Sequence, residues 1–325
     1  MFTFILAAIA KHAMANSEQA HDLPARFIAN RVVVEPSLAN GKTLSFFTDT
    51  GGGANMLCRD AAERAGLELV PFTDPEVENE LGKNLAKVDF PAFRDGAGIP
   101  ANAIGDTRML VYDCRPTEDS QGFLSSRWFD GRVWTWDYPN GKLRLESNKF
   151  QSGETARPVE LGFKADKTGK RQFAMPRIVI RIDNSELNML LDTGATTTLM
   201  PAALTVVGDM LPTVRATSFI AHSRFEQWHK RHPQWRIIDA AEVGTFARMI
   251  EVAEVDIAGF EVGPVWFTER PDTFRQWMGQ MMDKVPEGAI GGDALSYFTL
   301  TVDYPNAVAY FRCSSRCQPT PQSAP

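Results

Sequence analysis

Two aspartates in the same three-residue setting are the side chains of this sequence best suited to chemistry. Asp49 and Asp192 each open an Asp-Thr-Gly triplet, and each follows a short apolar run. One such triplet is expected by chance in about one chain of this length in fifteen, so two copies at matching places indicate a common role. Two carboxylates held within hydrogen-bond distance cannot both ionise cheaply, and they share one proton. Such a pair can supply an acid and a base together.

The chain around these triplets repeats as well, which predicts the elements that hold them. Each half runs in the same order: two strands, the triplet, a varied middle, a strand, an Asp-Tyr-Pro-Asn turn and a final strand. The strands are rich in Val, Ile, Phe, Trp and Thr, while proline and asparagine suit tight turns. Asp137 and Asp303 open these turns, so we assign them a structural role. The predicted strands are residues 31–34, 44–48, 133–136, 142–145, 177–180, 187–191, 299–302 and 308–311.

This order divides the chain into two lobes, predicted over residues 22–150 and 172–313. A connection at 151–171, rich in Gly, Ser, Lys and Thr, joins them, and residues 314–325 form a tail. Trp134 and Trp136 alternate along one strand, which assigns them to the core or to an interface between the lobes. Helices are expected to be few and short, at residues 59–66, 201–207 and 271–284.

The second triplet and its surroundings, residues 191–196 with Ala289-Ile290-Gly291, resemble a retropepsin-type aspartic protease domain. The first half, with its triplet at Asp49, is similar to a second and more divergent copy. The chain thus resembles pepsin-like enzymes, which form one active site from two halves of one chain, and looks like two fused retropepsin-type modules of the bacterial type. The likeness implies a mainly β, bilobal acid-protease fold with two pseudo-twofold-related β-barrel lobes and few short helices.

The resemblance also implies an activity. The chain would be an aspartic endopeptidase in which Asp49 and Asp192 activate a water for attack on a peptide carbonyl. This chemistry needs no metal, other cofactor or covalent intermediate. The partner would be a polypeptide substrate, and one chain would act as a monomer. The family pattern assigns the support of the active-site loops, including their cross-linking by the two threonines, to Thr50, Gly51, Thr193, Gly194 and Gly291.

The first half departs from the family pattern around its active-site loop. The counterpart of Ala289-Ile290-Gly291 is predicted at Ser120-Gln121-Gly122, which is polar, and three glycines follow Thr50 in a row. No tyrosine lies between Asp49 and Leu110, where pepsin-like enzymes carry one on a flap.

A flap is predicted instead near residues 90–100, with Phe93 as its aromatic wall and Gly96 at its tip. The departures of the first half leave two alternatives open. One is a non-catalytic peptide-binding protein of the same fold, and the other is a homodimeric protease that uses only Asp192.

Composition argues against several other classes of protein. Hydrophobic residues make up 44% and charged residues 23% of the 325 positions, the profile of a soluble globular protein. A formal net charge of -6 gives no electrostatic reason to expect nucleic acid or an anionic membrane as partner.

Two other kinds of functional site are not supported by the motifs. No Gly-x-Ser-x-Gly elbow of a serine hydrolase is present. His222, His229 and His232 could share a helical face, but Arg224, Lys230 and Arg231 around them favour a solvated basic helix over a metal site.

The N-terminus and the cysteines bear on location. Residues 1–10 are apolar and lead to Ala13-Met14-Ala15, the pattern of a secretory signal peptide over residues 1–15. The run is too short to span a bilayer, so no integral membrane span is expected. The protein is then expected in the periplasm or outside the cell. No Lys or Arg precedes the run, so the alternative is that it forms a buried first element of a cytoplasmic protein.

The chain contains four cysteines: Cys58, Cys114, Cys313 and Cys317. They could form one bridge within each half or remain buried thiols.

Overall fold

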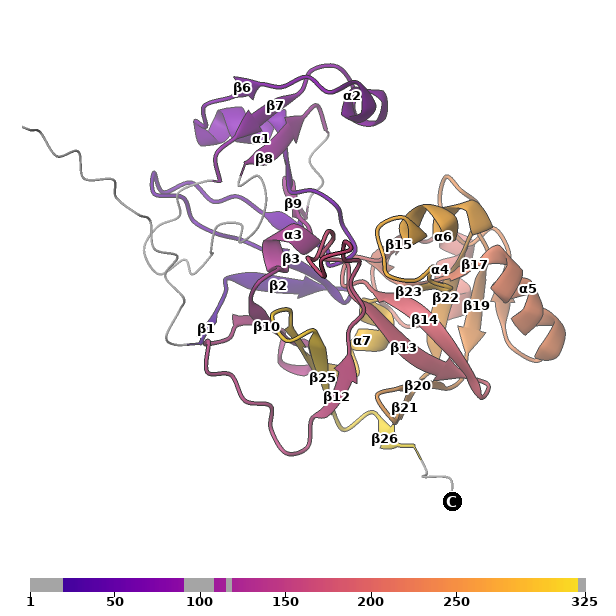
Figure 1. The fold of residues 1–325 in the computed structure, drawn as a ribbon. Helices are drawn as coiled ribbons and strands as arrows, with labels where there is room; N and C mark the ends of the chain where they lie inside the picture. Colours follow the sequence, from indigo (N-terminus) through magenta and orange to yellow (C-terminus); the bar gives the residue numbers. More distant parts are fainter. Residues whose placement is uncertain (1–19, 91–107, 115–118, 321–325) are drawn as a thin grey trace, which may run out of the picture.

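The computed structural model describes residues 20–90, 108–114 and 119–320, which form a mainly β molecule with two lobes (Figure 1). The first half builds one lobe, drawn in indigo to magenta, and the second half builds the other, drawn in orange. Strands of both halves meet in a further sheet between them. The predicted bilobal, mainly β fold is confirmed. The predicted signal peptide, residues 1–15, and the flap residues Phe93 and Gly96 lie outside the described residues.

The first lobe is built on an eight-stranded sheet. Its elements are β2 (Ala25–Ile28), β3 (Arg31–Val34), β4 (Phe46–Thr48), β5 (Met56–Cys58), α1 (Arg59–Ala65), β6 (Val70–Pro71), α2 (Pro75–Leu81), β7 (Ala86–Val88), β8 (Met109–Tyr112), β9 (Gly122–Leu124) and α3 (Ser126–Phe129). The strand order is β2-β3-β4-β9-β5-β8-β7-β6. Most pairings are antiparallel, but β4 pairs with β9 and β5 pairs with β8 in parallel.

The second lobe repeats these pairings in a ten-stranded sheet. Its elements are β13 (Arg177–Ile182), β14 (Ser185–Leu191), β15 (Thr196–Thr198), α4 (Pro201–Val207), β16 (Val214–Ala216), β17 (Ser218–Ala221), α5 (His222–Arg231), β18 (Ile237–Ile238), β19 (Met249–Val252), β20 (Val255–Ile257), β21 (Phe260–Val262), β22 (Val265–Arg270), α6 (Asp272–Gly279), β23 (Gly288–Ile290), α7 (Gly292–Leu295) and β26 (Gln318–Pro319). The order is β18-β19-β22-β17-β23-β14-β13-β20-β21-β26, while β15 and β16 pair separately. Here β14 pairs with β23 and β17 with β22 in parallel, as β4 pairs with β9 and β5 with β8 in the first lobe.

A six-stranded sheet joins the lobes. It contains β1 (His21–Asp22), β10 (Val133–Asp137), β11 (Lys142–Leu145), β12 (Arg157–Glu160), β24 (Phe298–Asp303) and β25 (Val308–Cys313). The order is β1-β11-β10-β24-β25-β12, so the closing strands of the two halves, β10 and β24, are neighbours. Thr135 pairs with Thr301 in this register, and their hydroxyls lie 2.7 Å apart. Because these two threonines occupy equivalent places in the halves, the pseudo-twofold axis passes between them.

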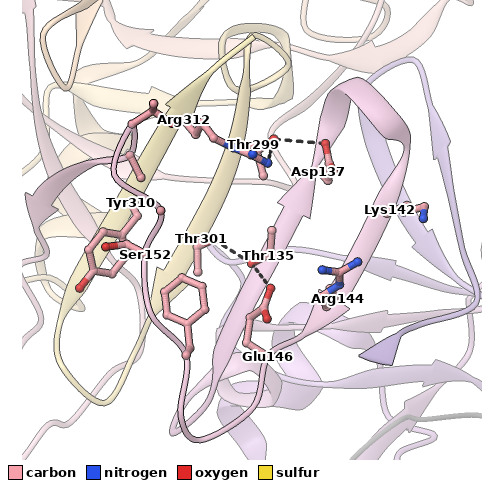
Figure 2. A pocket seen from close by; sticks show the side chains of 14 residues that line it. Thr135, Asp137, Lys142, Arg144, Glu146, Ser152, Thr299, Thr301, Tyr310 and Arg312 are labelled. Atoms are coloured by element: carbon pink, nitrogen blue, oxygen red, sulfur yellow. Dashed lines mark hydrogen bonds between the residues drawn. The ribbon is translucent and has the colours of Figure 1, made fainter. Parts of the chain in front are cut away.

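A polar pocket of about 180 Å³ opens on this central sheet. Figure 2 shows Thr135 hydrogen-bonded to both Thr301 and Glu146, and Thr299 hydrogen-bonded to Asp137, among the residues that line it. The threonine hydroxyls are therefore satisfied within the sheet.

The Asp-Tyr-Pro-Asn motifs make the predicted turns. Asn140 donates from Nδ2 to Oδ2 of Asp137 at 2.8 Å, and Asn306 makes the same bond to Asp303 at 2.8 Å. Each aspartate closes its own turn, which confirms the structural role predicted for it.

The core between the lobes is aromatic. Trp134 and Trp136 are fully buried, as predicted, and Trp134 packs on Trp128 with ring centroids 4.6 Å apart. Phe129 contacts Trp134 and Trp136, and its carbonyl accepts a hydrogen bond from the Trp134 indole at 2.8 Å. A buried indole N–H with a partner avoids the cost of an unsatisfied donor.

Two of the predicted helices match the structure and one is shorter. Helix α1 ends at a left-handed Gly66, with φ of 76°, and α4 spans residues 201–207 as predicted. The helix predicted over 271–284 ends at Gly279. Beyond the helix end, Asp283 forms an ion pair with Arg177 of β13. None of the helices in the described residues is both long and apolar enough to cross a membrane.

Both halves carry a disulfide. Cys58 at the end of β5 pairs with Cys114 beyond the end of β8, and Cys313 pairs with Cys317. Of the pairings left open by the sequence, the structure has the one that keeps each bridge within its own half.

Candidate active site

The two predicted catalytic aspartates lie at equivalent strand ends. Asp49 follows β4, and its N–H donates to the carbonyl of Leu124 at 2.9 Å. Asp192 follows β14, and its N–H donates to the carbonyl of Ile290 at 2.9 Å. In each lobe a parallel neighbour strand thus holds the aspartate backbone in place.

This pairing corrects the predicted support of the first active-site loop. The register aligns Thr48 with Leu124 in one lobe and Leu191 with Ile290 in the other. The counterpart of Ala289-Ile290-Gly291 is therefore Phe123-Leu124-Ser125, and the assignment to Ser120-Gln121-Gly122 was wrong by three residues. The apolar pair is present in both lobes: Leu124 and Ile290 are fully buried, and Phe123 is half-buried beside Gly52. Only the final glycine is replaced, by Ser125.

Ser125 and Gly291 are anchored in the same way. The N–H of Ser125 donates to Oδ1 of Asn55 at 2.7 Å, while the N–H of Gly291 donates to Oγ of Ser218 at 3.1 Å. A Cβ on Gly291 would lie 1.8 Å from the carbonyl oxygen of Thr217, so only glycine fits there. Asn55 and Ser218 escaped sequence analysis because each takes this role through a strand pairing, which no local motif marks.

The backbone of each triplet folds over its own carboxylate. The N–H of Gly51 donates to Oδ1 of Asp49 at 2.6 Å, and the N–H of Gly194 donates to Oδ1 of Asp192 at 2.9 Å. Hydrogen bonds from backbone N–H groups stabilise the ionised form of a carboxyl group. Both aspartates are thus oriented by their own loops.

The two threonines connect the loops across the pseudo-twofold axis. Thr50 donates from Oγ1 to the carbonyl of Leu191 at 2.6 Å, and the same oxygen accepts from the N–H of Thr193 at 3.0 Å. In return, Oγ1 of Thr193 accepts from the N–H of Thr50 at 3.3 Å. Both threonines are fully buried. This is the cross-link expected from the family resemblance, and Thr50 carries more of it than Thr193.

The glycines allow the loops to approach. A Cβ on Gly194 would lie 2.3 Å from Cγ of Asp49, and one on Gly51 would lie 2.8 Å from Cγ of Asp192. A Cβ on Gly52 would meet the Phe123 ring at 2.4 Å. The glycine run of the first loop therefore reflects close packing against the opposite aspartate and Phe123.

The electrostatics of the dyad are those of a coupled acid pair. The carboxyl groups of Asp49 and Asp192 are hydrogen-bonded to each other. Burial, the charge of Asp192 and that hydrogen bond raise the pKa of Asp49 well above its ordinary value. Burial also raises the pKa of Asp192, although hydrogen bonds from Asp49 and nearby backbone N–H groups oppose the rise. The two carboxyl groups can therefore share one proton, and the titration of that proton belongs to the pair.

Another buried carboxyl group, that of Asp293, lies in α7, which begins directly after Gly291. Oδ1 of Asp293 accepts from Oγ of Ser218 at 2.8 Å, and its Oδ2 is buried without a hydrogen-bond partner among the described residues. Burial raises the pKa of Asp293 to about 6. The sequence analysis assigned no role to this residue, and its place is set by α7.

An apolar cluster backs the second active-site loop. Leu190 and Ala195 flank the triplet of the second lobe, and both pack with Phe219. Phe274 lies edge-on to Phe219 at 6.5 Å, and Trp277, which is 51% exposed, stacks on Phe274 at 5.8 Å. An apolar surface beside the dyad is suited to side chains of a peptide. The cluster also contains Met175, Met278, Met281, Met282 and Ala289.

The histidines on α5 have other partners. Nδ1 of His222 lies 2.5 Å from Glu269, and with Glu226 these residues form a group that could hold a metal ion. However, Arg248 already pairs with both carboxylates. His232 stacks on Trp235 with ring centroids 4.1 Å apart. Because the guanidinium neutralises both carboxylates of that group, we assign it to a surface ion-pair network rather than a metal centre.

Comparison with known proteins bears on the fold. No protein-family model matches the chain, and no curated protein sequence matches it significantly. The solved structure of an aspartic proteinase from Irpex lacteus matches 91% of this chain and 98% of its own, with a TM-score of 0.50 and 12% identity. Conglutin gamma, a basic 7S globulin from lupine seeds, matches 92% of this chain and 96% of its own, with a TM-score of 0.47 and 12% identity. The first of these matches establishes the pepsin-like fold.

Proposed function

We propose that this protein is an aspartic endopeptidase whose catalytic dyad is Asp49 and Asp192. The observation that carries the proposal is the pair of hydrogen-bonded carboxyl groups, each oriented by its own loop. A fold that needed only a binding groove would have no reason to bury two carboxyl groups together, because their mutual repulsion is costly. Burial of such a pair supports acid–base chemistry.

The proposed reaction needs one water and one shared proton. The ionised member of the dyad takes a proton from a water that attacks the peptide carbonyl carbon, while the protonated member donates its proton to the carbonyl oxygen. Collapse of the tetrahedral intermediate breaks the C–N bond: the carboxyl group that took the water proton gives it to the amine nitrogen, and the other carboxylate takes a proton from a hydroxyl of the intermediate. The dyad ends with one proton, as it began.

The two alternatives are less well supported by the geometry. A peptide-binding protein without activity was suggested by a polar support loop in the first lobe and by the missing flap tyrosine, and Phe123-Leu124-Ser125 removes the first of these reasons. A homodimer using only Asp192 is unnecessary, because Asp49 of the same chain meets Asp192 and the threonine cross-link joins both loops.

Three further properties belong to this proposal. We propose that the lobes are related to retropepsin-type modules of the bacterial type, on the strength of the two Asp-Thr-Gly triplets. The protein would act as a monomer on polypeptides. Export to the periplasm or the medium would suit the two disulfides, since such bonds persist in oxidising compartments.

The test compares wild type with Asp49→Asn and Asp192→Asn, with Asp239→Asn at an exposed position as the matched control. Cleavage of a peptide library is measured by mass spectrometry from about pH 3 to 7. We expect each dyad variant to lose activity by about 1,000-fold or more, while the control keeps it.

Two results would contradict the proposal in different ways. Activity that survives in Asp49→Asn but not in Asp192→Asn would refute the single-chain dyad and favour the homodimer. A folded wild type that binds peptides without cleaving them at any pH would favour the binding protein.

A further inference from the structure

A small polar pocket lies beside the active-site loop of the first lobe, apart from the dyad itself. Its volume is about 200 Å³, and residues of both halves line it. Gly53, Ser126, Arg127 and Asp130 come from the first lobe, and residues 171–175 lead into the second. The pocket thus opens where the two lobes meet.

The contacts around this pocket tie it to the dyad. Gly52 donates from its N–H to the carbonyl of Asp49 at 3.3 Å, and the Gly52 carbonyl accepts from Oγ of Ser126 at 2.7 Å. On the other wall, Cε of Met175 lies 3.9 Å from the position of a Cβ on Gly53. Met175 packs in the same apolar cluster as Leu190. The pocket therefore shares a wall with the loop that carries Asp49.

The charges of the pocket do not balance. Arg171 forms an ion pair with Asp130, whose side chain is 5% exposed, and it also donates to the carbonyl of Tyr304 at 2.7 Å. Arg127 is exposed, and among the described residues its guanidinium has neither an ion pair nor a hydrogen bond. Two arginines facing one aspartate leave one positive charge, and it belongs to Arg127.

We propose that Arg127 makes this pocket a subsite for a carboxylate of the substrate, so that the protease prefers a peptide with a Glu or Asp side chain near the scissile bond. This inference rests on the proposed peptidase function. A guanidinium without a competing partner can bind a carboxylate through two parallel N–H donors, and charge-assisted bonds of this kind are the stronger ones. Asp130 does not compete, because Arg171 already neutralises it. A free C-terminal carboxylate offers the same chemistry and is the second source to be distinguished.

The experiment uses a peptide that the wild type cleaves, with Glu and Gln placed in turn at each position within four residues of the cleaved bond. We expect kcat/KM to favour Glu over Gln by about 5- to 20-fold at one position near pH 6. The preference should disappear in Arg127→Met and turn towards Lys in Arg127→Glu. Arg181→Met, which removes an exposed arginine paired with Glu186 outside the pocket, should keep it.

Two further arms sharpen the result. The Glu preference should fade below about pH 4, where the substrate carboxyl group is protonated while arginine stays charged. Amidated peptides distinguish the sources, because a preference that needs a free C-terminus identifies the terminal carboxylate instead of a side chain.

The inference would be overturned by a wild type that treats Glu and Gln alike at every position, or by a preference that survives in Arg127→Met. Both results leave the proposed activity intact. If the wild type cleaves no peptide, the proposed function fails, and fluorescence anisotropy then measures whether the Glu peptide binds more tightly than the Gln peptide. Equal binding would overturn the inference, and a preference that Arg127→Met abolishes would uphold the subsite.

Discussion

The backbone of Gly194 passes so close to the carboxyl group of Asp49 that no side chain fits between them. A Cβ on Gly194 would lie 2.3 Å from Cγ and 2.4 Å from Cβ of Asp49. These residues come from different halves of the chain, and their contact sets how closely the two loops can approach. A glycine of one triplet is thus required by the aspartate of the other.

Gly194→Ala should therefore damage the dyad directly. The added methyl group must push Asp49 away, and we expect kcat to fall by about 100-fold or more, with a stability loss of about 1 to 3 kcal/mol. Gly153→Ala is the matched control outside the active site, because no atom lies within 4 Å of a Cβ placed there. Peptide cleavage and urea unfolding measure the two effects. Equal activity of both variants would show that the loops are looser than this contact requires.

The threonine cross-link should be asymmetric. Oγ1 of Thr50 takes part in two buried hydrogen bonds and Oγ1 of Thr193 accepts one longer bond. Thr50→Val, which keeps the shape, should cost about 1 to 3 kcal/mol in the free energy of unfolding, and Thr193→Val less. Thr50→Ser should retain most of the stability. Chemical denaturation measures the free energy of unfolding of the three variants. A larger loss of stability in Thr193→Val than in Thr50→Val would contradict the expected asymmetry.

Asp293 should make stability depend on pH in a defined direction. Its pKa rises from 3.8 to about 6 on folding, because burial disfavours the charged form. Between these values the folded state binds more protons than the unfolded state, so the free energy of unfolding falls as pH rises. Asparagine does not titrate, so the stability of Asp293→Asn should not fall in this way as pH rises. The free energy of unfolding of the variant should therefore increase relative to that of wild type by up to about 3 kcal/mol between pH 4 and 7.

Asp283→Asn provides a control of opposite sign. Burial would raise the pKa of Asp283, but the hydrogen bonds and charge of Arg177 outweigh it and lower the pKa. Wild type should therefore be the more stable of this pair once pH rises above about 4, and the advantage should disappear in stronger acid. Thermal unfolding across about pH 2 to 7 measures both series. A constant difference between Asp293→Asn and wild type over this range would refute the assigned titration.

The two disulfides should contribute unequally to stability. Cys58 and Cys114 are 56 residues apart in sequence, whereas Cys313 and Cys317 are 4 apart. A crosslink that closes a longer loop removes more entropy from the unfolded chain, about 4 kcal/mol for the first bridge and about 2 for the second. Urea unfolding of Cys58→Ala/Cys114→Ala and Cys313→Ala/Cys317→Ala tests this order. Free thiols found by titration of the unfolded, unreduced wild type would contradict the bridges themselves.

Many of the local elements could be predicted from the sequence. Strands 31–34 and 142–145 have the predicted bounds, because alternating or continuous β-branched and apolar residues favour extended backbone. The Asp-Tyr-Pro-Asn turns were also predicted, since their side chains bond within four residues. The helix predicted over 271–284 was too long, because the apolar spacing continues past Gly279, the poor helix former at which the helix ends.

The support of the first loop shows where sequence reasoning stopped. Ser120-Gln121-Gly122 was chosen because it ends in glycine, like Ala289-Ile290-Gly291. Strand register places Leu124 beside Thr48, so Ser125 takes the equivalent position and is anchored by Asn55. A shift of three residues cannot be detected without the pairing partner, because register is a property of two strands together.

The sequence by itself determined the two Asp-Thr-Gly triplets, the repeated order of strands and turns, and hence which two aspartates could form a pair. These features depend on residue types and short spacings. Only the tertiary structure decided that Thr50 and Thr193, 143 residues apart, bond across the loops. It alone also placed Arg127 at the pocket with no ion pair among the described residues, while Arg171 pairs with Asp130. Such long-range choices follow from packing the whole chain, because they depend on which side chains compete for each partner in space.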